Sequence, residues 1–237
     1  MSKLNEESIV KPKPFRDFAG ENIVYIPFDS PSRLLQKAIK KSALKEKDTG
    51  FGYFYLLKNK IVLYQSLGAP SAVISLERLI VSGAKEIVLL GFCGSLNPEY
   101  RIMNIVSISK AFSEEGTSKH YFSQKRIFYP SPALKNRIES FLHCSKLPFL
   151  IGSFVSTDAP YRETKSWLEQ QQKIGIDFVD MEASAVFALA KFYGIQAAAL
   201  MIISDELWSG AWKEGFQHPQ LEEKINKYFI PLIKEPD

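Results

Sequence analysis

The sequence has few of the residues that support metal or disulfide chemistry. Among its 237 residues are two cysteines, Cys93 and Cys144, and three histidines, His120, His143 and His218. Neither set has the spacing of metal ligands or of a disulfide framework. We therefore expect two reduced thiols, no metal ion and no cofactor in a cytoplasmic protein.

Long apolar runs and clusters of like charge are also missing. The longest apolar runs, 87–90 and 197–203, are far shorter than the roughly 20 residues that cross a bilayer. Residues 1–15 alternate charges with prolines and contain no apolar core of a secretory signal. The net charge is only +4, and no basic tract is interleaved with aromatic residues. These absences argue against membrane and nucleic-acid partners.

The remaining composition is that of a globular domain, with 46% hydrophobic and 24% charged residues. Residues 1–20 are polar and contain prolines, which predicts an N-terminal arm. Residues 21–237 show no internal repeat and have the length of one domain. Within them, short β-branched runs alternate with helical patterns, which is typical of the α/β class.

The hydrophobic periodicity and the turn residues predict individual elements. Ser30-Pro31 is typical of a helix start, and Gly194 of a helix end. The expected strands are 22–26, 51–57, 61–65, 86–90, 103–109, 147–156, 178–180 and 196–204. The expected helices are 30–44, 71–82, 164–172, 182–193, one that begins at Pro132 and one that begins at Leu221.

Polar or glycine-rich groups follow several of these strands. They are residues 65–68, 91–94, 156–158 and 204–205, and residues 180–182 join another strand to its helix. Taken alone, each of them is better explained as an ordinary turn or a helix cap. Ligands of α/β sheets bind beyond the carboxyl ends of the strands, so together these groups predict one cleft.

Glu182 and Asp205 are the candidate catalytic pair in that cleft. One helix and one strand separate them, so both can face the same edge of the sheet. A carboxylate accepts hydrogen bonds from both hydroxyls of a ribose, and an acid beside a departing base can protonate it. Carboxylates also stabilise the cationic sugar that forms as the bond breaks. The pair therefore suits cleavage of a nucleoside.

At these residues the sequence resembles the nucleoside phosphorylase superfamily. Val-Asp-Met-Glu-Ala-Ser at 179–184 is similar to the Val-Glu-Met-Glu-Ala segment of nucleoside phosphorylases and of methylthioadenosine/adenosylhomocysteine nucleosidases, and Ser204-Asp205 to the Ser-Asp pair that follows it. The resemblance covers residues 22–216 in the right order. Three further segments that carry the resemblance are 68–71, the Gly-x-x-Gly turn at 91–94 and the base-side segment 155–164. Two more segments, 115–121 and 205–212, most resemble the uridine phosphorylase-like branch.

The resemblance implies a fold and an activity. The fold is a single α/β domain whose central mixed sheet is partly closed as a barrel and flanked by helices. The activity is that of a pentosyltransferase of nucleotide salvage, which cleaves a nucleoside with inorganic phosphate to give a free base and ribose 1-phosphate. Members are homo-oligomers, hexamers or dimers, in which a neighbouring subunit often completes the site.

The resemblance also implies roles for individual residues. Glu182 is similar to the ribose-binding glutamate, and Asp205 to the acid that protonates N7 of a purine. Met181, which packs under the sugar in the family, and Tyr161 fit core packing equally well. The assigned ribose-binding residues are Glu182, Met181 and Asp180, and the base-binding residues are Pro160, Tyr161, Ser204 and Asp205.

The phosphate side departs from the family pattern. Leu89 and Phe92 stand where many phosphorylases have an arginine and a serine or threonine, and neither side chain can bind an oxyanion. A helix N-terminus that carries Arg33 remains a reasonable anion site. The positions assigned to the anion are Arg33, Ser30, Gly91 and Phe92, and Lys45 or Lys47 of a neighbouring subunit is a further candidate. Asp180 is one methylene shorter than the usual glutamate, so its bond to the sugar is expected to be lost or water-bridged.

Three functions stay open at this point. The motif set favours a phosphorylase that uses Arg33. Leu89 and Phe92 favour a nucleosidase, in which Asp29 or Asp180 activates water. A catalytically silent nucleoside-binding homologue is the third.

The base also stays open. Thr164 and Ser166 stand where pyrimidine-specific enzymes have glutamine and arginine. Asp205 suits a purine, whereas the branch resemblance favours uridine.

Overall fold

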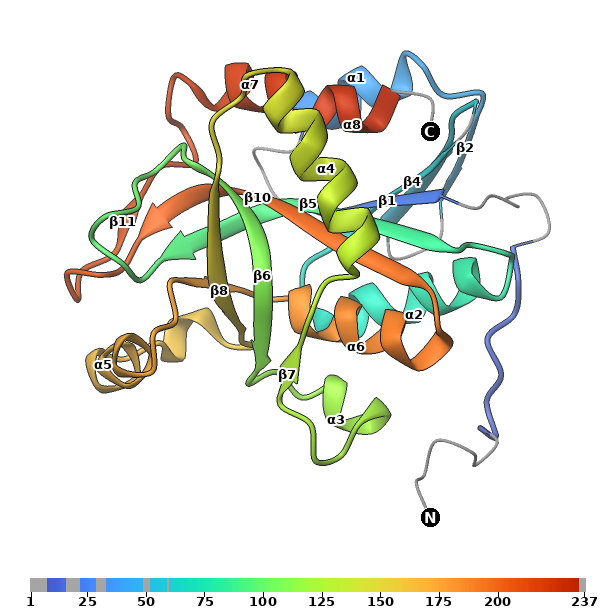
Figure 1. The fold of residues 1–237 in the computed structure, drawn as a ribbon. Helices are drawn as coiled ribbons and strands as arrows, with labels where there is room; N and C mark the ends of the chain where they lie inside the picture. The colour runs from blue at the N-terminus through green and yellow to red at the C-terminus, as the bar shows by residue number, and fades with distance from the viewer. Residues whose placement is uncertain (1–7, 16–21, 29–32, 49–51, 59, 235–237) are drawn as a thin grey trace.

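The computed structural model describes residues 8–15, 22–28, 33–48, 52–58 and 60–234. These residues form one large mixed sheet with helices on both faces (Figure 1). The strands are β1 Asn22–Phe28, β2 Lys45–Asp48, β3 Gly52–Leu56, β4 Ile61–Ser66, β5 Glu86–Ser95, β6 Ile105–Ser113, β7 Ile127–Phe128, β8 Leu150–Ser156, β9 Phe178–Asp180, β10 Gln196–Glu206 and β11 Lys213–Glu214.

Helices connect most of the strands. The C-terminal helical stretch begins as an α-helix, α7, continues as a π-helix and ends as α8. The helices are α1 Arg33–Lys40, α2 Ala69–Ile80, α3 Ser118–Tyr121, α4 Pro132–Cys144, the 3-10 helix Pro160–Arg162, α5 Lys165–Lys173, α6 Ala183–Tyr193, α7 Leu221–Lys224, the π-helix Ile225–Phe229 and α8 Ile230–Lys234.

Strand β5 is the centre of the sheet. It pairs in parallel with β1 and β10 and antiparallel with β9. The pairings β10–β6, β6–β8 and β8–β9 complete a closed barrel of five strands. Beyond β1 the sheet continues through β4 and β3 to β2. This arrangement confirms the predicted mixed sheet with partial barrel closure, and it brings the carboxyl ends of β5 and β10 together.

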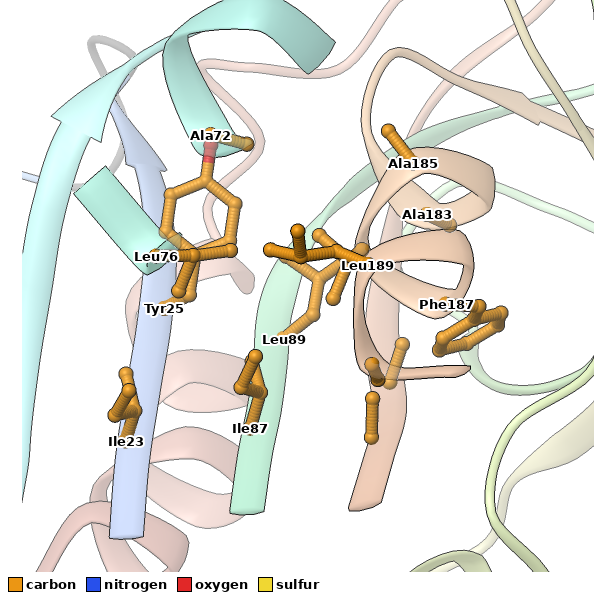
Figure 2. Close-up of a cluster of buried hydrophobic side chains, with 14 of the residues drawn as sticks. Ile23, Tyr25, Ala72, Leu76, Ile87, Leu89, Ala183, Ala185, Phe187 and Leu189 are labelled. Carbon is orange, nitrogen blue, oxygen red and sulfur yellow. The ribbon is translucent and has the colours of Figure 1, made fainter. Parts of the chain in front are cut away.

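Side chains alternate between two apolar cores, one on each face of the sheet. On β1, Ile23 and Tyr25 pack with α2 and α6, whereas Val24 and Ile26 pack with α1, α4 and the C-terminal helices. Figure 2 shows the first of these cores, in which Tyr25 and Leu76 lie between β1 and α2. Because successive residues of a strand point to opposite faces, the apolar runs of β1 and β5 contribute side chains to both cores.

Helix α6 is rich in small side chains, which allow close packing beside its larger buried residues, Phe187 and Leu189. Ala183, Ala185 and Ala188 are fully buried there. Gly194 ends the helix in the left-handed conformation, with φ 69°, as expected for the residue that follows a helix C-terminus. The position of α6 matters for function because Glu182 immediately precedes it.

The expected helix over 30–44 is too long. Helix α1 ends at Lys40, and Lys45–Asp48 forms strand β2, which pairs antiparallel with β3. The ladder with β3 uses the backbone hydrogen-bonding groups of this segment, which local helical periodicity could not reveal. The predicted start at Ser30-Pro31 lies outside the described residues.

The expected turn at Gly91 to Gly94 is wrong, because β5 runs through both glycines to Ser95. Close packing explains the glycines instead. A Cβ atom on Gly91 would lie 3.0 Å from Sδ of Met201, and one on Gly94 would lie 2.6 Å from Cδ1 of Leu207. Both glycines therefore let neighbouring strands approach β5.

Residues 8–15 form no helix or strand, but Phe15 is buried. Its ring packs edge-on against Phe54, with the centroids 4.4 Å apart. Among the described helices, none has the length and apolar character that a membrane span requires.

Candidate functional site

A cavity of about 550 Å³ opens where β5, β9 and β10 end. Its lining includes both Glu182 and Asp205, so the two carboxyl groups that the sequence singled out share one hollow. Cys93, Gly94 and Leu67 contribute from the glycine-rich segments. The convergence follows from the topology, because β5 pairs with both β9 and β10.

Glu182 is buried at the N-terminus of α6 and is held by a backbone amide. The N–H of Gly68 donates to its Oε1 atom at 2.6 Å. Gly68 has φ 101° and precedes α2, a conformation that favours glycine. The loop before α2 therefore orients Glu182 within the cavity.

Asp180 lines the cavity but also caps α6. Its Oδ1 accepts from the Ser156 hydroxyl at 2.5 Å, and its Oδ2 accepts from the backbone N–H groups of Glu182 at 3.0 Å and Ala183 at 2.6 Å. Burial raises the pKa of Asp180 to about 6 despite these bonds, and the charge of Glu115 adds to the rise. These contacts organise the start of α6.

Glu115 is a buried acid behind the cavity that the sequence reading did not assign to the site. It accepts hydrogen bonds from the hydroxyls of Ser113 at 2.7 Å and Ser184 at 3.0 Å. Burial acts to raise its pKa, but hydrogen bonds from Ser118 and Ser113 outweigh burial and hold the pKa below its usual range. Glu115 thus fixes a second point of α6 as an anion.

Asp205 reaches the cavity beside an irregularity in β10. The register between β10 and β5 shifts between Ile203 and Asp205, which leaves Ser204 without a partner in the ladder. The hydroxyl of Ser204 lies 2.7 Å from Oδ1 of Asp205, and the indole N–H of Trp212 donates to Oδ2 at 3.0 Å. Burial raises the pKa of Asp205, and these two hydrogen bonds limit the rise.

The base-side residues lie at the mouth of the cavity. Pro160 and Tyr161 line it from the 3-10 helix, and the Tyr161 side chain is 95% exposed. Core packing therefore does not account for Tyr161. Met181 lines the cavity and is half-buried, and Trp212 adds a second exposed aromatic ring.

Glu163 is a cavity residue that the sequence reading did not single out. It lies between the 3-10 helix and Thr164, the N-cap of α5, so an acid there has the pattern of an ordinary helix start. Burial raises its pKa to about 7, and the charges of Asp205 and Glu114 contribute to the rise. Glu163 belongs to the base-side segment 155–164, but nothing in the sequence distinguishes this one carboxyl group from its neighbours.

Of the positions expected to bind phosphate, the structure fully describes Gly91 and Phe92. Phe92 lines the cavity, but Gly91 does not. Leu89 is fully buried and lies opposite Tyr25 in the β1–β5 ladder, among apolar side chains (Figure 2). The Leu89 side chain therefore belongs to the core and offers nothing to an anion.

Cations are scarce in the described part of the cavity wall. Lys165 is the cationic residue among the described lining residues, and Lys45 and Lys47 lie exposed on β2 outside the lining. Ser30 and the side chain of Arg33 lie outside the described residues. Across those residues, no three His, Cys, Asp or Glu side chains form a group that could hold a metal ion.

The sequence profile of the Phosphorylase superfamily matches residues 29–228. The chain belongs to this superfamily. Among related proteins, a guanosine phosphorylase of Halorubrum lacusprofundi is 30% identical over 158 residues, 67% of this chain and 66% of its own. A DeoD-type purine nucleoside phosphorylase of Caldanaerobacter subterraneus is 28% identical over 188 residues, 78% of either chain.

Solved structures of the superfamily share the fold. The purine nucleoside phosphorylase of Toxoplasma gondii, in complex with immucillin-H, superimposes with a TM-score of 0.75 at 20% identity, over 94% of this chain and 95% of its own. The uridine phosphorylase of Vibrio fischeri gives a TM-score of 0.71 at 21% identity, over 94% of this chain and 92% of its own. The predicted superfamily and fold are thus confirmed.

The capping contacts of Asp180 predict a stability effect. We expect Asp180→Ala to lower the free energy of unfolding by about 1–3 kcal/mol near pH 4, because it leaves buried donors without an acceptor. The pKa of about 6 lies above the ordinary value, so the stability that Asp180 contributes is lost as the pH rises through 6. The difference between wild type and variant, measured by urea unfolding, should shrink between pH 4 and pH 7.

Asp158→Ala is the matched control, because Asp158 is exposed and accepts one hydrogen bond, from the N–H of Gly116 at 2.7 Å. We expect Asp158→Ala to lower the free energy of unfolding by less than Asp180→Ala does. Equal losses in the two variants would contradict the capping role, and a difference for Asp180→Ala that grows with pH would contradict the raised pKa.

Proposed function

We propose that the protein cleaves the N-glycosidic bond of a purine nucleoside with inorganic phosphate, releasing the free base and ribose 1-phosphate. The observation that carries the proposal is the shared cavity of Glu182 and Asp205. Relatives named as guanosine and purine nucleoside phosphorylases support the purine assignment. So does Asp205, because an acid whose pKa is raised can donate a proton to a ring nitrogen.

In this proposal Glu182 binds the sugar. Its carboxylate accepts hydrogen bonds from the 2′ and 3′ hydroxyls, while the Gly68 amide keeps it oriented. Met181 lies next to Glu182 in the lining and packs under the ribose. Asp180 acts mainly by holding the N-terminus of α6, through the amides of Glu182 and Ala183.

Asp205 serves the leaving base. As the bond between C1′ and the ring nitrogen breaks, its electron pair moves to the purine, and Asp205 delivers a proton to N7. An oxygen of phosphate forms the new bond to C1′. Negative carboxyl groups around the cavity stabilise the positive charge that develops on the sugar. Pro160 and Tyr161 stack on the base at the mouth.

Phosphate binds, in the same proposal, at the N-terminal end of α1 near Ser30 and Arg33. Leu89 is buried in the core and Phe92 is apolar, so the ligands must come from elsewhere. A second copy of the chain is the proposed source of a further cation, Lys45 or Lys47, because both lie exposed on β2.

The reaction class is tested by base release from inosine, guanosine, adenosine and uridine, with and without phosphate. We expect release from a purine nucleoside only when phosphate is present, with ribose 1-phosphate as the second product. Chromatography of both products gives the measurement. Release without phosphate would indicate a nucleosidase, and no release from any nucleoside would indicate a silent homologue.

Asp205→Asn tests the proton donor. We expect kcat for a purine nucleoside to fall at least tenfold, since losing a general acid costs about 10²–10⁴-fold, while nucleoside affinity changes little. Asp158→Asn is the control outside the cavity. Steady-state kinetics and calorimetry give the two quantities. Unchanged turnover would remove Asp205 from the mechanism.

Glu182→Ala tests the sugar contact. Loss of hydrogen bonds to a charged acceptor costs about 1.5–3 kcal/mol, so nucleoside affinity should fall about 10- to 100-fold. The free base should bind as it does to wild type, because it lacks the ribose. Calorimetry with both ligands makes the comparison, and circular dichroism checks the fold. Normal nucleoside affinity in the variant would refute the ribose assignment.

A further inference from the structure

We propose that Glu163 and Asp205 form a carboxyl pair that holds one proton at the base end of the cavity, with Glu163 acting as a positioning residue for the proton that Asp205 delivers. The inference rests on the proposed function for Asp205. It adds a residue to which no role has been assigned above.

The hydrogen-bonding of the two carboxyl groups is unequal. Both line the same cavity. Asp205 is contacted by the Ser204 hydroxyl and the Trp212 indole, at 2.7 and 3.0 Å. The carboxyl group of Glu163 has no hydrogen-bond partner among the described residues. Hydrogen bonds of this kind favour the ionised form, so they direct the negative charge to Asp205 and leave the proton to Glu163.

The charges that face Glu163 are mostly negative. Asp205 faces it from β10 and Glu114 from the end of β6, and both raise its pKa. Glu114 accepts hydrogen bonds from the indole of Trp167 at 2.7 Å and the amide of Gln171 at 2.8 Å. Asp180, Glu182 and Lys165 also line the cavity, and Lys165 makes no ion pair with a described residue.

Two interacting acids lose their protons in two steps, and the apparent pKa of each step describes the pair rather than either residue. Between the steps the pair carries one proton and one negative charge. Burial, with Asp205 and Glu114, places the pKa of Glu163 at about 7, so the shared proton persists to neutral pH. An isolated aspartate would already have lost its proton well below that pH.

The proton transfer in this scheme is balanced. The proton resides mainly on Glu163 in the free enzyme and moves to Asp205 as the purine binds. When the C1′–N bond breaks, Asp205 passes the proton to the ring nitrogen that receives the electron pair. The pair is then doubly negative, and it regains one proton from water after the base leaves.

Glu163→Gln tests the pair through the pH profile of kcat/KM between pH 5 and pH 9. A glutamine cannot hold the proton that the pair retains to neutral pH, so Asp205 must then keep its proton without a partner carboxyl group. We therefore expect kcat/KM of the variant to fall at high pH about one pH unit lower than that of wild type. At pH 5 its kcat/KM should stay within about threefold of the wild-type value. Glu169→Gln, on the exposed face of α5, should leave the profile unchanged. An unchanged basic limb in Glu163→Gln would overturn the proposal.

A titration that needs no catalysis separates this proposal from the proposed function. With carboxyl-¹³C-labelled glutamate, the resonance missing from Glu163→Gln identifies Glu163 in the ligand-free protein. We expect a midpoint near pH 7 in wild type and a lower midpoint in Asp205→Asn. A midpoint in the ordinary glutamate range, or one that Asp205→Asn leaves unchanged, would overturn the pair. If no nucleoside is cleaved, the proposed function fails, and the titration still decides whether the pair exists.

Discussion

The site depends on how closely β9 and β10 approach β5 at Gly94. A Cβ atom there would lie 3.0 Å from Cγ1 of Val179 and 3.1 Å from Oδ2 of Asp205. Gly94 therefore allows the strand that leads to Glu182 and the strand that carries Asp205 to meet at the end of β5. A larger residue would force the two strands apart, and the two carboxyl groups would no longer share a cavity. Close packing at one glycine thus sets the geometry of the proposed chemistry.

Among the described residues, four acids line this cavity, and each has a different environment. Asp180 accepts hydrogen bonds from backbone amides, Glu182 from the amide of Gly68, and Asp205 from a hydroxyl and an indole, whereas the Glu163 carboxyl has no donor among the described residues. Differences of this kind set apart the protonation states of neighbouring carboxyl groups, as enzymes require when one acid must donate while another accepts. The acid-rich wall also suits a sugar that becomes positively charged. It offers little to phosphate, which explains why the proposed anion site lies elsewhere.

Much of the fold was predictable from the sequence. Hydrophobic periodicity indicated the individual helices and strands, and the order of the motifs along the chain indicated the family fold. Glu182 and Asp205 could be paired in advance because each follows a recognisable strand. Strand β2 was missed because its pairing with β3 is a tertiary contact. The glycines of β5 were taken for a turn because the atoms they accommodate, on Met201 and Leu207, are distant in sequence. Glu163 was missed for the same reason, since its raised pKa comes from burial and from charges on other elements.

The most direct test is a crystal structure with phosphate and a slowly reacting purine nucleoside. The account predicts that the 2′ and 3′ hydroxyls contact the carboxylate of Glu182, that N7 lies within hydrogen-bond distance of Asp205, and that phosphate lies near C1′ at the N-terminal end of α1. A nucleoside bound outside this cavity, or one whose base contacts Glu182 while its sugar faces Asp205, would contradict it.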